Sequence, residues 1–128
     1  MINGSGGRAG AGGAGTVVGA EWGWLMFALV VRFELLDDEA AVEFDRLASE
    51  TLPLIESSEP GTLVYATHRI EDEPLARVFY EVYRDREAFE SHERQPHVVR
   101  FHAEKERCLA GARVEFLEPS GTKGIPRD

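Results

Sequence analysis

The stretch TLVYATHRIEDEPLARVFYEVYR (62–84) decides the fold. Two runs rich in β-branched and aromatic residues flank a short polar segment (71–74), a pattern that predicts an antiparallel hairpin. Alternate residues of a strand point to opposite faces of a sheet. Glu81 stands in mid-strand between Tyr80 and Val82, and its carboxylate needs a partner if that face is buried.

A helical pattern precedes the hairpin. Asp37 and Asp38 offer an N-cap and an acidic first turn. Apolar residues then recur at helical spacing from Ala41 to Ile55. The tripeptide Glu-Pro-Gly (59–61) is a strong turn signal that leads into the hairpin. These features predict one amphipathic helix packed on the sheet.

A second helical pattern follows the hairpin. Asp85 is the expected N-cap, and Pro96 interrupts the helix and restarts it at a first-turn position. We expect Gly111 to end this helix at the C′ position. The single cysteine, Cys108, is expected to be a small buried side chain on the apolar stripe. One cysteine excludes an intrachain disulfide and a cysteine-based metal site.

Two further strands complete the pattern, one over residues 26–35 and one over residues 112–117. The order β-α-β-β-α-β predicts a ferredoxin-like α+β fold, with a four-stranded antiparallel sheet and two helices on one face. The other face carries Phe, Tyr, Val and Leu, and an apolar surface of that size favours a partner. We therefore expect a homodimer formed through the open sheet face.

The chain divides into three parts by composition. Residues 1–25 contain nine of the thirteen glycines, and such a segment cannot bury enough apolar surface to fold, so we expect a disordered extension. Residues 26–118 form the expected single domain. Residues 119–128 contain Pro and Gly and are expected to form an extended tail.

The net charge of −9 argues against several classes of partner. Nucleic-acid binding relies on Lys and Arg that neutralise phosphates, so neither nucleic acid nor an anionic membrane surface is expected to bind. The longest apolar stretch (22–31) is far shorter than the roughly 20 residues of a membrane-spanning helix. The N-terminus lacks the features of a secretory signal, so we expect a cytoplasmic protein.

The histidines are the first candidates for chemistry: His68, His92, His97 and His102. A histidine paired with a carboxylate beside a pocket can transfer protons, and His92 or His97 is the expected partner of Glu81. The alternative is that Glu81 forms a structural ion pair with Arg77 or Arg113. No metal site is expected, because the helical histidines are spaced by five residues, whereas ligands that share a helix face are spaced by three or four.

The aromatic residues allow two interpretations. Tyr65, Tyr80 and Tyr83, with Phe79 and Phe89, could line an aromatic pocket for a small ligand. They could equally fill the core and a dimer interface. The sequence leaves both open.

Several motifs resemble one known family. The segments EPGTLVY (59–65) and FYEVYRDREAFESH (79–92), followed by Pro96-His97 and Phe101, resemble the antibiotic biosynthesis monooxygenase (ABM) family. The resemblance covers about residues 26–118. It implies a dimeric α+β barrel in which each subunit has a pocket between its sheet and its helices.

The resemblance also implies a reaction. Many members are cofactor-independent monooxygenases that oxidise a phenol, anthrone or quinol, with O2 as co-substrate. Glu81 and His92 match the paired positions of the family, which implies that His92 or His97 is the base and that Glu81 orients it. The residues expected to bind substrate are Tyr65, Tyr83, His68, Phe89 and Phe101.

Other activities of the family stay open. An isomerase of the autoinducer-processing type needs a similar pocket and proton shuttle, and a ligand-binding barrel needs no chemistry at all. Haem degradation ranks well below these. His102 falls where haem-degrading members have an axial histidine, but the first strand here lacks the Asn that they need.

Overall fold

The computed structural model describes residues 26–125. The expected disordered extension (1–25) lies outside the described residues. The helices and strands follow one another in the order β1 (Phe27–Leu35), α2 (Asp38–Ser58), β2 (Thr62–Ile70), β3 (Glu73–Tyr83), α3 (Arg86–Arg94), α4 (Pro96–Lys105), the 3₁₀ turn η2 (Glu106–Cys108) and β4 (Leu109–Leu117).

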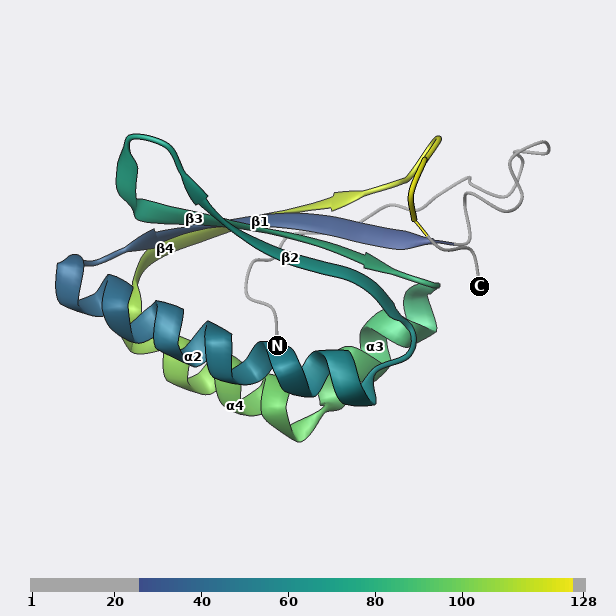
Figure 1. The fold of residues 1–128 in the computed structure, drawn as a ribbon, viewed down its shortest axis with the longest axis horizontal. Coiled ribbons are helices and arrows are strands. Elements are labelled where there is room, and N and C mark those ends of the chain that lie inside the picture. Colours follow the sequence, from purple (N-terminus) through teal and green to yellow (C-terminus); the bar gives the residue numbers. More distant parts are fainter. Residues whose placement is uncertain (1–25, 126–128) are drawn as a thin grey trace.

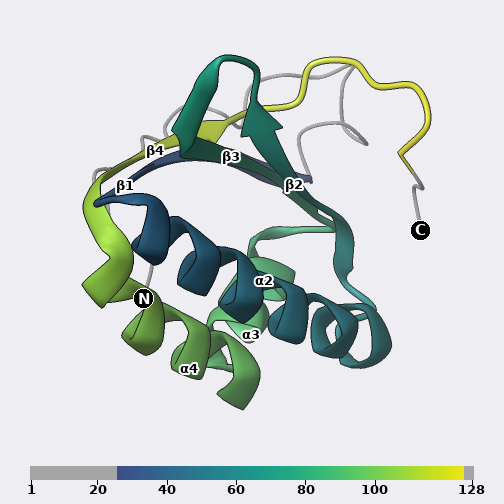
Figure 2. The ribbon, with the colours of Figure 1, turned by 60° about the vertical axis from the view of Figure 1, so that its left-hand side comes forward.

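The sheet confirms the ferredoxin-like prediction. Its four strands are antiparallel and lie in the order β2-β3-β1-β4, so β1 and β3 are central. The three helices cover one face of the sheet, as Figures 1 and 2 show from two sides. The sheet is open, and β2 and β4 form its edges.

The N-caps of both helical segments form as predicted. The side chain of Asp37 accepts a hydrogen bond from the backbone N–H of Ala40, and that of Asp85 accepts one from Ala88, each at 2.8 Å. Each bond satisfies an N–H that lacks a partner in the first helical turn. The break before Pro96 is also confirmed: Gln95 is extended, because a residue before proline avoids the helical region. The expected second helix is therefore two, α3 and α4.

The expected end of the last helix at Gly111 is wrong. The helix ends at Lys105, η2 follows, and Gly111 lies inside β4 opposite Glu34. The backbone N–H of Leu36 donates to the carbonyl of Cys108 at 3.0 Å, which brings the chain to β1 before the glycine is reached. The residues from Leu109 onward then pair with β1, so β4 begins three residues earlier than expected.

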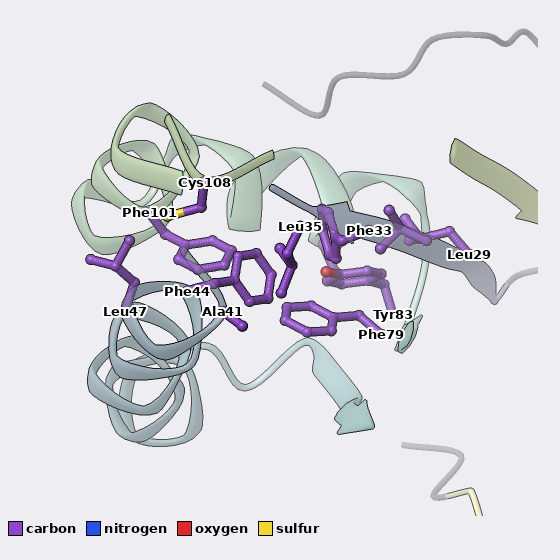
Figure 3. Packing of buried hydrophobic residues seen from close by; sticks show 12 residues of the cluster. Leu29, Phe33, Leu35, Ala41, Phe44, Leu47, Phe79, Tyr83, Phe101 and Cys108 are labelled. Carbon is purple, nitrogen blue, oxygen red and sulfur yellow. The ribbon is translucent and has the colours of Figure 1, made fainter. Parts of the chain in front are cut away.

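The main core lies between the sheet and the helices. Alternate residues of β1 point towards the helices and are buried, in agreement with the period of a strand. Aromatic rings dominate the packing, with centroid separations of 5.0 Å for Phe33 and Phe44 and 5.9 Å for Phe44 and Phe101 (Figure 3). This layer holds α2 and α4 against β1 and β3.

A smaller cluster lies on the outer face of the sheet. Ala28 and Val82 are buried there beside Met26, and Ile125 from the segment after β4 packs against them. Val78 and Tyr80, on the same face of β3, stay partly exposed. The chain therefore covers part of the face through which we expect dimerisation.

Gly61 lets the turn before β2 lie against α3. A Cβ at this position would be 2.7 Å from the Cβ of Ala88, closer than real Cβ atoms approach one another. The backbone N–H of Arg84 also donates to the Gly61 carbonyl at 2.9 Å. The absence of a side chain thus sets the distance between the 59–61 turn and α3.

We predict that Gly61→Ala destabilises the protein by about 1–3 kcal/mol, because the added methyl meets a backbone-anchored Cβ and not a flexible side chain. Urea unfolding measures the difference. Gly111→Ala is the matched control, since a Cβ there would meet no atom within 4 Å. Equal stability of the two variants would contradict the close approach of Gly61 to α3.

Candidate active site

Glu81 is a buried carboxyl on the helix-facing side of β3. Only 4% of the residue is exposed, and its Oε1 accepts a hydrogen bond of 2.5 Å from the Tyr83 hydroxyl, two residues along the same face. Burial raises the pKa of Glu81 to about 7, although the Tyr83 hydrogen bond and the nearby His92 favour the ionised form. The carboxyl can therefore gain or lose a proton near neutral pH.

Glu81 lies at a cavity between the sheet and α4. Its walls are mostly apolar and aromatic, and its polar groups come from both sides: Tyr65 and Glu81 from the sheet, His102 and Lys105 from α4. The cavity is partly open to solvent, and its volume is about 20 Å³. That is room for about one water, so a ring-sized ligand must displace side chains to enter.

A second buried cluster centres on Glu59, at the end of α2. Its Oε2 lies 2.6 Å from His97 Nε2, and its Oε1 lies 2.7 Å from His92 Nδ1 and 2.8 Å from the Thr62 hydroxyl. Burial opposes ionisation, yet the hydrogen bonds from His92, Thr62 and His97 hold the pKa of Glu59 below its usual value. An ionised carboxylate only accepts hydrogen bonds, so Nδ1 of His92 and Nε2 of His97 both donate to Glu59. When His92 is neutral, its Nε2 is then an acceptor.

The cluster corrects the expected partner of His92. The carboxylate bonded to His92 is that of Glu59, whereas Glu81 is bonded to Tyr83. The sequence shows Glu59 only as part of a turn signal. The Glu59 side chain reaches His92, 33 residues later in the sequence, because Gly61 allows the 59–61 turn to lie against α3.

The two tyrosines connect this cluster with the cavity. The rings of Tyr65 and Tyr83 lie 5.5 and 5.1 Å from the His92 ring, measured between centroids. Tyr65 is also the strand neighbour of Glu81 in the β2–β3 pairing and lines the cavity. His92 thus contacts Tyr65, which lines the cavity, but is not itself among the residues that line it.

The remaining predicted residues divide into two groups. Phe101 lines the cavity with Tyr65 and Glu81. His68 is exposed and its Nδ1 lies 3.1 Å from the Val78 carbonyl, while Phe89 packs against Phe27 with centroids 4.7 Å apart. The structure thus brings Tyr65, Glu81 and Phe101 together and leaves His68 and Phe89 away from the cavity.

Lys105 is a polar cavity residue that the sequence prediction missed, and His102, a candidate for chemistry, lines the cavity beside it. His102 Nε2 lies 3.2 Å from Glu93 Oε2, and its Nδ1 lies 3.0 Å from Lys105 Nζ. Lys105 follows Val98 and Phe101 by seven and four residues, a spacing that places it on their buried helix face. An axial haem ligand needs a free ring nitrogen, and both nitrogens of His102 have partners, so this histidine does not fit that role.

The described part of the chain holds neither a cluster of metal-ligating side chains nor a helix that could span a membrane. Among residues 26–125, no group of three or more His, Cys, Asp or Glu is arranged to hold a metal ion. Within the same range, no helix is long and apolar enough to cross a membrane.

We predict that Glu59→Gln lowers the free energy of unfolding by about 1–3 kcal/mol, because the amide replaces an acceptor with a donor beside histidine N–H groups. Chemical denaturation at pH 7 measures the change. The effect should shrink as the pH falls below the ordinary glutamate value of 4.5, since a depressed pKa stabilises only while the carboxylate stays ionised. The exposed Glu56→Gln serves as control and should stay within about 0.5 kcal/mol of the parent.

We predict a pH dependence of the opposite sign for Glu81. Its pKa is raised from 4.5 to about 7, so the buried neutral carboxyl stabilises the fold at low pH, and this contribution is lost as the pH rises through 7. Between pH 5 and pH 8 the parent should lose on the order of 2–3 kcal/mol relative to Glu81→Gln. Parallel stability curves for the two proteins would show that Glu81 titrates normally.

Comparisons with known proteins agree with this architecture. Among solved structures, the chain is similar to a provisionally assigned antibiotic biosynthesis monooxygenase from Caulobacter crescentus (22% identity, 77% of this chain and 93% of the other, TM-score 0.72). It is also similar to Rv0793 from Mycobacterium tuberculosis (23%, 76% and 97%, TM-score 0.69). A third is a point mutant of SnoaB, a cofactor-independent oxygenase from Streptomyces nogalater (19%, 78% and 98%, TM-score 0.67).

At these identities the structures establish the fold alone, and the sequence comparison decides the family. No curated protein sequence matches the chain significantly. The model of the antibiotic biosynthesis monooxygenase (ABM) family, in contrast, matches residues 26–104, from β1 into the last turn of α4. The matched range includes Glu59, Glu81, His92 and His102. The chain therefore belongs to the ABM family.

Proposed function

We propose that this protein is a cofactor-independent monooxygenase that oxidises a small phenol, anthrone or quinol with O2 in the cavity between the sheet and α4. The observation that carries the proposal is Glu81. It is a buried carboxyl with a pKa of about 7, and it faces a cavity lined by aromatic and aliphatic side chains. A general base acts best when its pKa is near the working pH.

In the proposed reaction, Glu81 removes a proton from the bound substrate. The resulting electron-rich anion passes an electron to O2, and the two radicals combine to a peroxide. Glu81 returns the proton, and loss of water leaves a carbonyl group. A CH2 group and O2 thus give C=O and water. One oxygen atom enters the product, and the substrate supplies all four electrons, so no outside reductant is needed.

The surrounding residues would position the reacting groups. The Tyr83 hydroxyl donates to Glu81 and stabilises the ionised base. Tyr65 would contact the substrate from the sheet side, and Phe101 would pack on its ring from α4. His92, held by Glu59, would fix the two tyrosine rings by packing against them. In this arrangement His92 and His97 are positioning residues, and the base is Glu81 in place of the histidine expected from the sequence.

The comparisons support this class of reaction. The family is named for monooxygenases, and SnoaB, which shares the fold, is described as a cofactor-independent oxygenase. We also propose that the protein works as a homodimer through the outer sheet face. Val78 and Tyr80 remain partly exposed there and would be covered by a second copy.

The test is oxygen uptake by the purified protein with a panel of anthrones, naphthols and quinols. We predict that kcat/KM rises as the pH passes through about 7, and that Glu81→Gln lowers kcat by about 10²–10⁴-fold. Glu90→Gln, an exposed carboxyl on α3, is the control and should leave the rate unchanged. Full activity of Glu81→Gln would refute its role as base. A lack of uptake with the whole panel would refute the monooxygenase proposal and favour an isomerase or a ligand-binding protein.

A further inference from the structure

We propose that Lys105 forms a subsite for a negatively charged oxygen, so that the cavity selects hydroxyaromatic ligands and holds them as oxyanions. This inference rests on the cavity of the proposed function, but it concerns ligand binding and not the reaction with O2.

Lys105 is a buried cation at the cavity. Only 2% of the residue is exposed, although it is a lysine in the last turn of α4. Its Nζ lies 6.0 Å from the centre of the Phe33 ring and 5.7 Å from that of the Phe101 ring. Both rings line the cavity with it. A lysine this deeply buried is rare and needs a compensating partner.

The hydrogen bonds of His102 show which of its ring nitrogens carries a proton and which one faces the Lys105 ammonium. The Glu93 carboxylate accepts, so the Nε2 of His102 carries the proton and its Nδ1 is a lone pair. That lone pair accepts from the Lys105 ammonium, which only donates. Burial lowers the pKa of His102 and the nearby Lys105 charge adds to this shift, although the Glu93 hydrogen bond raises the pKa, so the net shift favours the neutral imidazole. Among the described residues, the hydrogen-bond partner of the ammonium is thus an uncharged group.

The charges of the cavity suit an oxyanion. Burial lowers the pKa of Lys105, while the negative charges of Glu106, Glu93 and Glu81 oppose this shift. A ligand oxygen that bears a negative charge would compensate the ammonium inside an apolar cavity, where such a hydrogen bond is strong. Glu81 lines the same cavity from the sheet. Glu81 can therefore take the proton of a hydroxyl group whose oxygen then binds to Lys105.

The predicted specificity follows from this division of roles. A phenol, naphthol or enolisable ketone can lose a proton to Glu81 and bind to Lys105 through the resulting oxyanion. An aromatic hydrocarbon or a methyl ether fills the same space but leaves the ammonium without a charged partner. The site should therefore discriminate against them, because a buried polar group left unpaired weakens binding.

The test is anaerobic binding of 4-nitrophenol, whose ionised form is recognised by its visible absorption. We predict that the parent protein lowers the pKa of the bound probe by about one unit or more, which corresponds to at least tenfold preference for the phenolate. Lys105→Met keeps the length of the side chain and removes the charge, so this preference should disappear. The chain contains one other lysine, Lys123, which is exposed, and Lys123→Met should behave like the parent.

Two further measurements secure the interpretation. Binding of 4-nitroanisole, which cannot ionise, should be the same in the parent and in Lys105→Met, and this shows that the variant keeps its cavity. If Lys105→Met does not fold, Lys105→Gln replaces it, because the amide can still donate to His102 without a charge. Phenolate binding that is equally tight in the uncharged variant, or no binding of the probe to the parent, would overturn the inference.

The outcomes separate this inference from the proposed function. Phenolate binding that depends on Lys105, without oxygen uptake for any substrate, would support the subsite and refute the monooxygenase. Oxygen uptake and phenolate binding that are both unchanged in Lys105→Met would refute the subsite alone.

Discussion

The buried carboxylate of Glu59 is the interaction on which the arrangement of the candidate site depends. It joins the end of α2 to His92 on α3 and to His97 on α4. Because α3 and α4 are separate helices, this shared acceptor fixes both relative to the start of β2. Through His92 it also holds the tyrosine rings next to Glu81, and α4 in turn carries Phe101, His102 and Lys105 to the cavity.

The structure buries several ionisable groups in a small domain, at a cost in stability. Glu59 is compensated by three donors, whereas Glu81 has the Tyr83 hydroxyl and sits next to empty space. The two carboxyls consequently have pKa values shifted in opposite directions, one below and one above the usual value. Such a division is typical of a fold in which one carboxyl is structural and the other is available for proton transfer.

The sequence predicts the strands, the helix N-caps and the break before Pro96, because periodicity, capping and proline chemistry are local. It also identifies Glu81, since a charged residue in a buried strand is conspicuous. The partner of His92 could not be predicted, because it depends on how closely a turn approaches a helix 33 residues later. Lys105 did have a local signal, its spacing from Val98 and Phe101, but a lysine at such a position is usually taken for the edge of an apolar stripe.

The close approach at Gly61 has a consequence for the evolution of the chain. A methyl group at position 61 and the existing one at position 88 would compete for the same space. The two positions are therefore coupled: a side chain can be gained at 61 when the one at 88 is lost. Exchange of the two residues, Gly61→Ala with Ala88→Gly, should be tolerated better than the first change alone. Homologous sequences should accordingly show covariation between these sites, with the geometry of the Glu59 turn preserved.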